Sequence, residues 1–177
     1  MLAFSSVAHV GYAMVALILV PRMGAEALPP LMFYMVGYAI MTCGAFAVLV
    51  AMSHGGHERT DISDFSGLGM RRPVLSAVMT LFLISLAGLP PTIGFFTKYF
   101  LFSAAVQQGM VGLIVVAVIN SVISVGYYVR PIVEMYFKLP VKGTTPAAMV
   151  DASAGVPYPV WIVLAITAIG VIVGGVF

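Results

Sequence analysis

Long uninterrupted runs of apolar residues dominate the chain, and short polar or proline-containing segments separate them. Five runs approach or exceed the roughly 20 residues that a helix needs to cross about 30 Å of hydrocarbon. They cover residues 2–20, about 31–52, 74–89, 111–137 and 158–177, and a sixth, shorter run covers about 92–106. Because the runs are continuously apolar and do not alternate, they favour helices over the strands of a membrane barrel. The pattern predicts an all-α integral membrane protein, a bundle of about six transmembrane helices.

Two polar segments interrupt this pattern. Residues 53–73 hold two of the three histidines and six charged residues, and the stretch from Asp61 to Phe65 predicts the start of a short interfacial helix because acids occupy its first turn. Residues 138–157 are rich in Pro, Gly, Thr and Ala, which is typical of a solvent-exposed loop. No internal repeat or second domain is visible, so residues 1–177 are expected to form a single transmembrane domain.

The composition excludes several other classes of protein. Hydrophobic residues make up 62% of the chain and charged residues only 8%, whereas soluble domains carry about a quarter charged residues. Disordered chains have low hydrophobicity and high net charge, so this composition excludes disorder as well. The formal net charge of +2 is small and scattered, so no nucleic-acid partner is expected. A single cysteine, Cys43, excludes a disulfide framework.

The loop charges do not orient the predicted bundle. If every run crosses the membrane, the basic residues divide three against three, with Arg22, Lys138 and Lys142 on one side and Arg59, Arg71 and Arg72 on the other. The positive-inside rule then favours neither orientation.

Lys98 is the ionisable residue that fits least well among apolar neighbours. It lies in the short run, about seven residues from the nearest break on one side and nine on the other. A charged side chain at such a depth costs about 2.5–3.5 kcal/mol on insertion scales, so it marks a functional site by default. A buried lysine can take up and release a proton when its surroundings change. The alternative is a lysine that reaches the headgroups from a segment that does not span the membrane.

The residues before Lys98 predict an interruption of the helix. Pro90 and Pro91 remove two backbone donors and push Leu89 away from helical angles. Discontinuous helices of this kind place ion-binding groups near the middle of the membrane in transporters. A tight turn between two separate helices explains the two prolines equally well at this level. Residues 107–109 offer a second possible break beyond Lys98.

His9 is a second buried candidate for proton transfer. Ser5, His9 and Tyr12 recur at helical spacing and so share one face of the first predicted helix. An imidazole in such a row can pass protons between hydrogen-bonded neighbours. A neutral histidine that simply satisfies a neighbouring helix is the more common arrangement, and the pattern slightly favours it.

The fifth apolar run carries a similar polar face. Asn120, Ser124 and Tyr127 lie on one side of the predicted helix, where they could line a channel or bond to other helices. Contacts of the second kind average about 0.6 kcal/mol, and they are the more common role for any one residue. Arg130 and Glu134 are four residues apart and are expected to pair with each other.

Other sites receive little support from the sequence. His54 and His57 flank two glycines in the polar segment, but a His-x-x-His pair in a loop is a weak metal signal, so no metal is expected. Residues 67–72 lack the third glycine of a dinucleotide fingerprint and follow no strand. No arrangement of nucleophile and base points to catalysis within this chain.

Several motifs resemble those of a known family. The matching stretches are residues 1–12, 38–46, 64–69, 72–73, 85–98 and 120–130, of which Leu-Pro-Pro-Thr at 89–92 is the most specific. On these residues the sequence resembles the antiporter-like, proton-pumping membrane subunits of respiratory complex I. The family has three branches, subunits L, M and N. Lys98 stands where subunit M has a glutamate, which favours subunit N or L. Tyr127 and Tyr128 then favour subunit N.

The resemblance implies a fold and roles for particular residues. The family has fourteen transmembrane helices in two inverted five-helix repeats, each with a broken helix, and this chain resembles the second repeat plus the final helix. Lys98 matches the broken-helix lysine that takes part in proton transfer, and His9 matches a histidine that usually follows the Ser-Ser pair. The ionisable residues of the first repeat have no equivalent here. The chain is therefore expected to be a C-terminal fragment that holds the exit-side half of a proton path.

The function implied by the resemblance is that of an NADH-quinone oxidoreductase subunit, which couples electron transfer to proton pumping. NADH, flavin, iron–sulfur clusters and quinone are expected in partner subunits and no cofactor in this chain. The expected partners are neighbouring antiporter-like subunits, the lipid bilayer and protons, and a bacterial inner membrane is favoured over a mitochondrial one. A standalone or Mrp-type cation/proton antiporter subunit is the alternative, and a membrane scaffold without an ion path is a third possibility.

Overall fold

The computed structural model describes residues 1–52, 62–138 and 157–176, and in this part of the chain every regular element is helical. The elements follow one another as α1 (Leu2–Met23), η1 (Gly24–Ala27), α2 (Leu28–Met52), η2 (Ile62–Phe65), α3 (Leu68–Arg71), α4 (Pro73–Ala87), α5 (Ile93–Gln107), α6 (Val111–Phe137) and α7 (Tyr158–Val176). Six of the helices are long, namely α1, α2, α4, α5, α6 and α7. The predicted all-α bundle of about six helices is confirmed.

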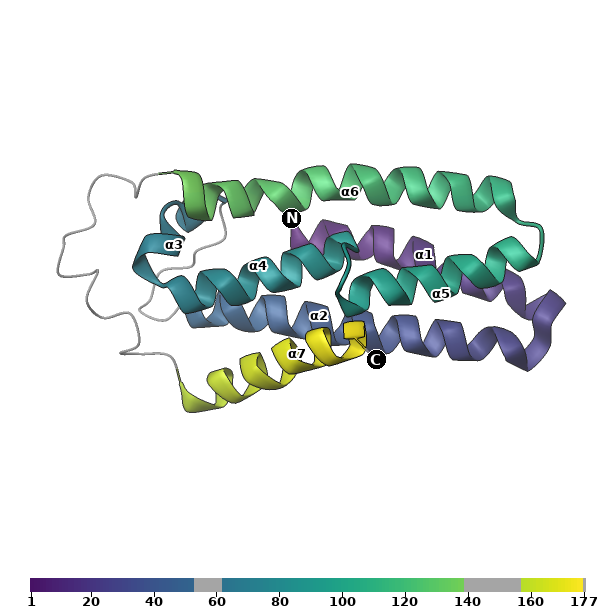
Figure 1. Cartoon of the computed structure of the whole chain (residues 1–177), viewed down its shortest axis with the longest axis horizontal. Helices are drawn as coiled ribbons and strands as arrows, with labels where there is room; N and C mark the ends of the chain where they lie inside the picture. The colour runs from purple at the N-terminus through teal and green to yellow at the C-terminus, as the bar shows by residue number, and fades with distance from the viewer. Residues whose placement is uncertain (53–61, 139–156, 177) are drawn as a thin grey trace.

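The long helices lie side by side along one axis of the molecule (Figure 1). α1 and α2 form an antiparallel pair joined by η1, and α2 packs against α1, α4, α5 and α7. The stretch Leu2–Met52, which contains both α1 and α2, is long and apolar enough to cross a membrane, and so are α6 and α7. Large apolar side chains such as Phe4, Val116 and Ile166 are exposed on the outward faces of these helices. Such a surface suits lipid or other membrane helices, and the chain is a multi-pass membrane protein.

α4 and α5 together form one discontinuous helix. Each has 15 residues and is therefore about 22 Å long, which is short of the hydrocarbon thickness. α5 continues in the direction of α4 after a short non-helical segment that contains Pro90 and Pro91 (Figure 1). The chain does not reverse at the two prolines, so α4 and α5 follow one another as two halves of a discontinuous helix and not as two separate helices joined by a tight turn.

The interruption is enclosed by protein. The Gly94 backbone approaches the Ser85 carbonyl so closely that a Cβ atom would collide with it, and the Gly94 amide donates to Ser85 Oγ over 3.2 Å. Gly175 of α7 lies against the other side, where an added Cβ atom would come within 2.5 Å of the Pro91 carbonyl oxygen. Non-helical backbone at membrane depth is tolerated only in such surroundings.

The basic residues gather at one end of the bundle. Because α4 and α5 share one crossing, the end of α6 returns to the segment before α4, and Gly69 packs against Tyr136. Among the described residues, Arg71, Arg72 and Lys138 therefore lie at this end, while Arg22 lies at the other. The expected tie of three against three is wrong, because it assumed that α4 and α5 cross separately.

Glu134 has different partners from the one predicted. Its carboxylate pairs with Lys138 over 2.8 Å and accepts a 2.5 Å hydrogen bond from Ser66, whose segment packs against α6. The predicted Arg130–Glu134 pair is wrong: the i,i+4 spacing gave Glu134 two possible cationic partners, and the structure pairs it with Lys138 at the helix end. The predicted short interfacial helix falls where η2 and α3 lie, although Asp61 itself is outside the described residues.

Candidate functional site at the helix interruption

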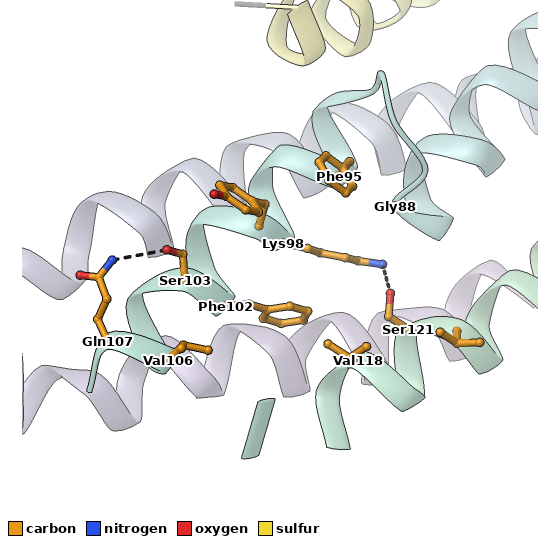
Figure 2. A pocket seen from close by; sticks show the side chains of 11 residues that line it. Gly88, Phe95, Lys98, Phe102, Ser103, Val106, Gln107, Val118 and Ser121 are labelled. Carbon is orange, nitrogen blue, oxygen red and sulfur yellow. Dashed lines mark hydrogen bonds between the residues drawn. The ribbon is translucent and has the colours of Figure 1, made fainter. Parts of the chain in front are cut away.

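Lys98 is buried beside the interruption, with 6% of its surface exposed. Helical side chains lean toward the N-terminus of their helix, so Lys98 points from α5 back toward the end of α4. Its ammonium group donates to the carbonyl oxygens of Leu86 and Ala87 over 3.2 and 3.1 Å. It also donates to Ser121 Oγ over 3.1 Å, as Figure 2 shows. An ammonium group has three donors, and these three contacts use all of them.

The end of α4 is well suited to hold a cation. The last carbonyl groups of a helix have no partners within it, and they form the negative end of the helix dipole. Gly88 caps α4 in the left-handed conformation, with φ of 86°. A Cβ atom at this position would lie 3.0 Å from both Cδ and Nζ of Lys98, so glycine leaves the room that the lysine occupies. The ammonium group thus faces the interruption and α6. This position favours a lysine that acts inside the bundle over the alternative of a lysine whose side chain reaches the lipid headgroups.

Two residues of α1 and α6 extend the site beyond Lys98. The Tyr12 ring centroid lies 5.3 Å from Lys98 Nζ, within the range of a cation–π contact. Asn120 Nδ2 donates to the Tyr12 hydroxyl over 3.0 Å, and Ser121 also interacts with that hydroxyl. Polar groups from α1, α5 and α6 therefore meet at the end of the Lys98 side chain.

His9 lies in a cluster of tyrosines next to this group. Its Nδ1 is 2.7 Å from the Tyr34 hydroxyl, its Nε2 is 3.3 Å from the Tyr128 hydroxyl, and its ring stacks on Tyr38 at a centroid distance of 4.5 Å. Both ring nitrogens have partners from neighbouring helices, as expected for a satisfied buried histidine. A phenol can donate and accept a hydrogen bond, so the same contacts also suit a proton relay. The Tyr12 ring meets His9 edge-on at 5.9 Å and connects the cluster to the Lys98 group.

The Lys98 group and the tyrosine cluster together form a row of polar side chains, made up of Lys98, Ser121, Tyr12, His9, Tyr34, Tyr38 and Tyr128. The remaining predicted residues lie around this polar row. The buried Ser5 hydroxyl donates to the Leu2 carbonyl over 2.7 Å and also interacts with Tyr128. Ser124 donates to the Ser121 carbonyl in its own helix over 2.6 Å, and the Tyr127 ring contacts the Tyr128 ring in a tilted arrangement with centroids 4.5 Å apart. Ser5 thus joins the row, whereas Ser124 and Tyr127 lie beside it.

Two members of the row were missed as candidates from the sequence. Tyr34 and Tyr38 lie four residues apart on α2, and their hydroxyl-bearing rings are embedded in an apolar run, where they resemble ordinary core residues. Their spacing on one helix face was the available signal. Ser121, which follows Asn120 in the sequence, was also not among the predicted site residues, yet it is the side chain that contacts Lys98 from α6.

Two cavities border residues of the polar row or their neighbours. A cavity of about 590 Å³ lies between α5 and α6, with Lys98 and Ser121 at one end and Ser103 and Gln107 toward the other (Figure 2). A second cavity, of about 470 Å³, lies between α1 and α6 and is bordered by polar groups of Ser5, Asn120 and Tyr127. Both have the volume of several water molecules, and the polar side chains that could bind water are those at the two ends of the first cavity and along the border of the second, because apolar side chains line most of the first.

The residues that the structure describes contain no group of three His, Cys, Asp or Glu side chains that could hold a metal ion. The histidines of the polar segment, His54 and His57, lie outside this part of the chain. What the described site offers chemically is a buried amine with three hydrogen-bonding partners, followed by hydroxyl groups and an imidazole. These groups can bind and transfer protons.

A membrane bundle with one helix interrupted beside a buried cation is typical of ion transporters. Residues 1–124 match the family model described as the transmembrane region of NADH:quinone oxidoreductase and Mrp antiporters. The chain therefore belongs to this family, and the predicted resemblance is confirmed.

Individual relatives agree with this assignment. NADH-quinone oxidoreductase subunit N of Bdellovibrio bacteriovorus is 41% identical over 179 residues, a match that covers 100% of this chain and 36% of the relative. Subunit N of Trichlorobacter lovleyi is 47% identical over 138 residues, covering 78% of this chain and 28% of the relative. A chain of respiratory complex I from Thermus thermophilus, solved with bound aureothin, superposes with a TM-score of 0.66 at 30% identity, covering 96% of this chain and 37% of that one. The chain thus spans about a third of the length of these proteins.

Proposed function

We propose that this chain is a proton-translocating part of the membrane arm of an NADH-quinone oxidoreductase, and that it couples electron transfer from NADH to quinone to proton pumping. The observation that carries the proposal is Lys98, buried at a helix interruption and held by carbonyl groups of α4 and a hydroxyl of α6. The names of the relatives, which are subunits of such oxidoreductases, support the same conclusion.

In the proposed cycle Lys98 alternates between ammonium and amine. The carbonyl groups at the end of α4 stabilise the ammonium form through hydrogen bonds and the helix dipole. A change in the neighbouring charge, or a movement of α4 relative to α5, weakens this stabilisation and releases the proton. The interruption matters because two half-helices can shift against each other where a continuous helix could not.

The redox chemistry belongs to partner subunits in this proposal. NADH, flavin, iron–sulfur clusters and quinone act there, and neighbouring antiporter-like subunits transmit the change of charge or shape to Lys98. The proposed location is a bacterial inner membrane, as in the bacterial relatives. The end of the bundle that carries Arg71, Arg72 and Lys138 would face the cytoplasm according to the positive-inside rule.

The test is the variant Lys98→Ala in the full-length subunit within the assembled complex. We expect the complex to assemble and its NADH-driven proton pumping and coupled quinone reduction to fall. Lys138→Ala is the matched control, because Lys138 is a lysine at the end of the bundle with 63% of its side chain exposed. Pumping and turnover at wild-type rates in an assembled Lys98→Ala complex would refute the proposal.

A second candidate function is cation/proton antiport without electron transfer, since the matching family also includes Mrp antiporters. Sodium- or potassium-dependent proton exchange in vesicles without NADH would favour it. Both functions require Lys98, whereas a scaffold without an ion path would tolerate Lys98→Met. The cost of burying an ionisable side chain such as Lys98 at membrane depth argues for an ion path over a scaffold.

A further inference from the structure

The three partners of Lys98 are not chemically equivalent. Leu86 and Ala87 contribute backbone carbonyl oxygens, which can only accept hydrogen bonds. Ser121 contributes a hydroxyl group, which can both accept and donate. A proton that leaves Lys98 through one of these contacts can therefore pass only through Ser121.

Ser121 also suits both protonation states of Lys98. The ammonium form donates to all three partners. The neutral amine keeps two N–H groups, which match the two carbonyl oxygens, and gains a lone pair that faces Ser121. The serine hydroxyl can rotate and donate to this lone pair, so no buried polar group loses its partner. A third carbonyl in place of Ser121 would satisfy only the ammonium form.

The position of Ser121 connects Lys98 to the rest of the polar row. Ser121 is half-buried on α6, contacts Lys98 over 3.1 Å and interacts with the Tyr12 hydroxyl. Figure 2 shows the Lys98 side chain extended toward Ser121. The neighbouring residue, Asn120, donates to the Tyr12 hydroxyl, which leaves the hydrogen of that phenol free for another acceptor.

We propose that Ser121 is the proton relay between Lys98 and Tyr12, an inference that rests on the proton-translocating function proposed above. In the step, an N–H bond of the Lys98 ammonium group breaks as Ser121 Oγ binds its proton. Ser121 releases its own hydroxyl hydrogen to the Tyr12 oxygen, and Tyr12 releases its hydrogen to a water molecule. Lys98 ends as a neutral amine, both hydroxyl groups are restored, and the positive charge moves to the water. No electron is transferred.

The test uses the full-length subunit in the assembled complex, with assembly checked on native gels. Ser121→Ala removes the relay, and we expect NADH-driven pumping to fall by about 100-fold or more, since a positioned proton-transfer group contributes about 10²–10⁴-fold. Ser121→Thr keeps the hydroxyl and should restore pumping. Ser76→Ala is the matched control, because Ser76 is a fully buried serine of α4 that faces α6 through the Met135 sulfur and does not contact Lys98.

A relay also differs from a purely structural residue in its kinetic signature. The residual pumping of Ser121→Ala should show a changed pH profile and a changed solvent deuterium isotope effect, while Ser76→Ala keeps both. Wild-type pumping in Ser121→Ala, or a loss with an unchanged pH profile that Ser121→Thr does not restore, would overturn the inference. If Lys98→Ala abolishes pumping and Ser121→Ala does not, only the relay fails. If Lys98→Ala pumps normally, the proposed function itself fails.

Discussion

Replacing Gly88 by alanine tests whether the geometry of the interruption controls Lys98. Gly88 has a φ of 86°, where an L-residue pays about 1–2 kcal/mol. Its added Cβ atom would also lie 3.0 Å from Lys98 Nζ, closer than ordinary contact, so the ammonium group must move by a few tenths of an ångström. The Gly88→Ala variant therefore combines a backbone cost with a displaced lysine.

The expected effect follows from the length of the lysine hydrogen bonds. The contacts to Leu86 and Ala87 are 3.2 and 3.1 Å long, at the upper end of the usual range, so a small displacement breaks or weakens them. Hydrogen bonds to charged groups contribute about 1.5–3 kcal/mol. Loss of one such bond in the ammonium form corresponds to a change of about tenfold or more in proton affinity, because 1.4 kcal/mol is a factor of ten.

Gly109→Ala supplies the matched control. Gly109 has a similar φ of 76°, but nothing lies within 4 Å of the position of its Cβ atom. The Gly109→Ala variant therefore has the same unfavourable backbone conformation as Gly88→Ala, but its added Cβ atom does not contact Lys98. The assay is NADH-driven proton pumping by the assembled complex, together with its melting temperature. We expect a loss of thermal stability in both variants, larger in Gly88→Ala because its lysine contacts are also weakened, and a loss of pumping in Gly88→Ala alone. Equal pumping in the two variants would refute the reasoning.

Three further predictions concern other parts of the bundle. Tyr34→Phe leaves the Nδ1 atom of His9 without its partner, which should cost about 1–3 kcal/mol and lower the melting temperature; an unchanged value would show that water replaces the phenol. Glu134→Gln replaces the carboxylate that accepts a hydrogen bond from Ser66 by a neutral amide, which should loosen the segment of η2 and α3 from α6, seen as faster tryptic cleavage after Arg71; an unchanged cleavage rate would contradict this. In a background with Cys43 replaced by serine, a cysteine at Lys138 should react with an impermeant reagent only from the cytoplasmic side and one at Gly24 only from the opposite side; the reverse pattern would invert the proposed orientation.

The apolar runs and the buried lysine could be predicted because each depends on local sequence. A run of about 20 apolar residues has few alternatives to a membrane helix, and a lysine far from any break has few places to put its charge. Pro90 and Pro91 also located the interruption correctly. They could not show whether the chain reverses there, because the missing backbone donors are the same in a turn and in a discontinuous helix.

The contacts of the site could not be predicted because they depend on how the helices pack. The spacing of Arg130 and Glu134 suggested a pair, but Lys138 lies at the same spacing on the other side of Glu134, and Ser66 reaches the carboxylate from a separate segment. Ser121 carried no distinguishing signal, since a serine in a membrane helix usually bonds to its own backbone. Its contact with Lys98 appears only when α5 and α6 are placed side by side.

The number of protons translocated per NADH oxidised tests the central claim, that Lys98 carries a transported proton, most directly. The measurement compares wild type and Lys98→Met in sealed vesicles, with the assembled complex quantified on native gels. Methionine keeps much of the length and apolar volume of lysine but cannot bind a proton. The account predicts fewer protons per NADH, or arrested coupled turnover, in the variant. An assembled Lys98→Met complex with the wild-type ratio and the wild-type turnover would contradict it.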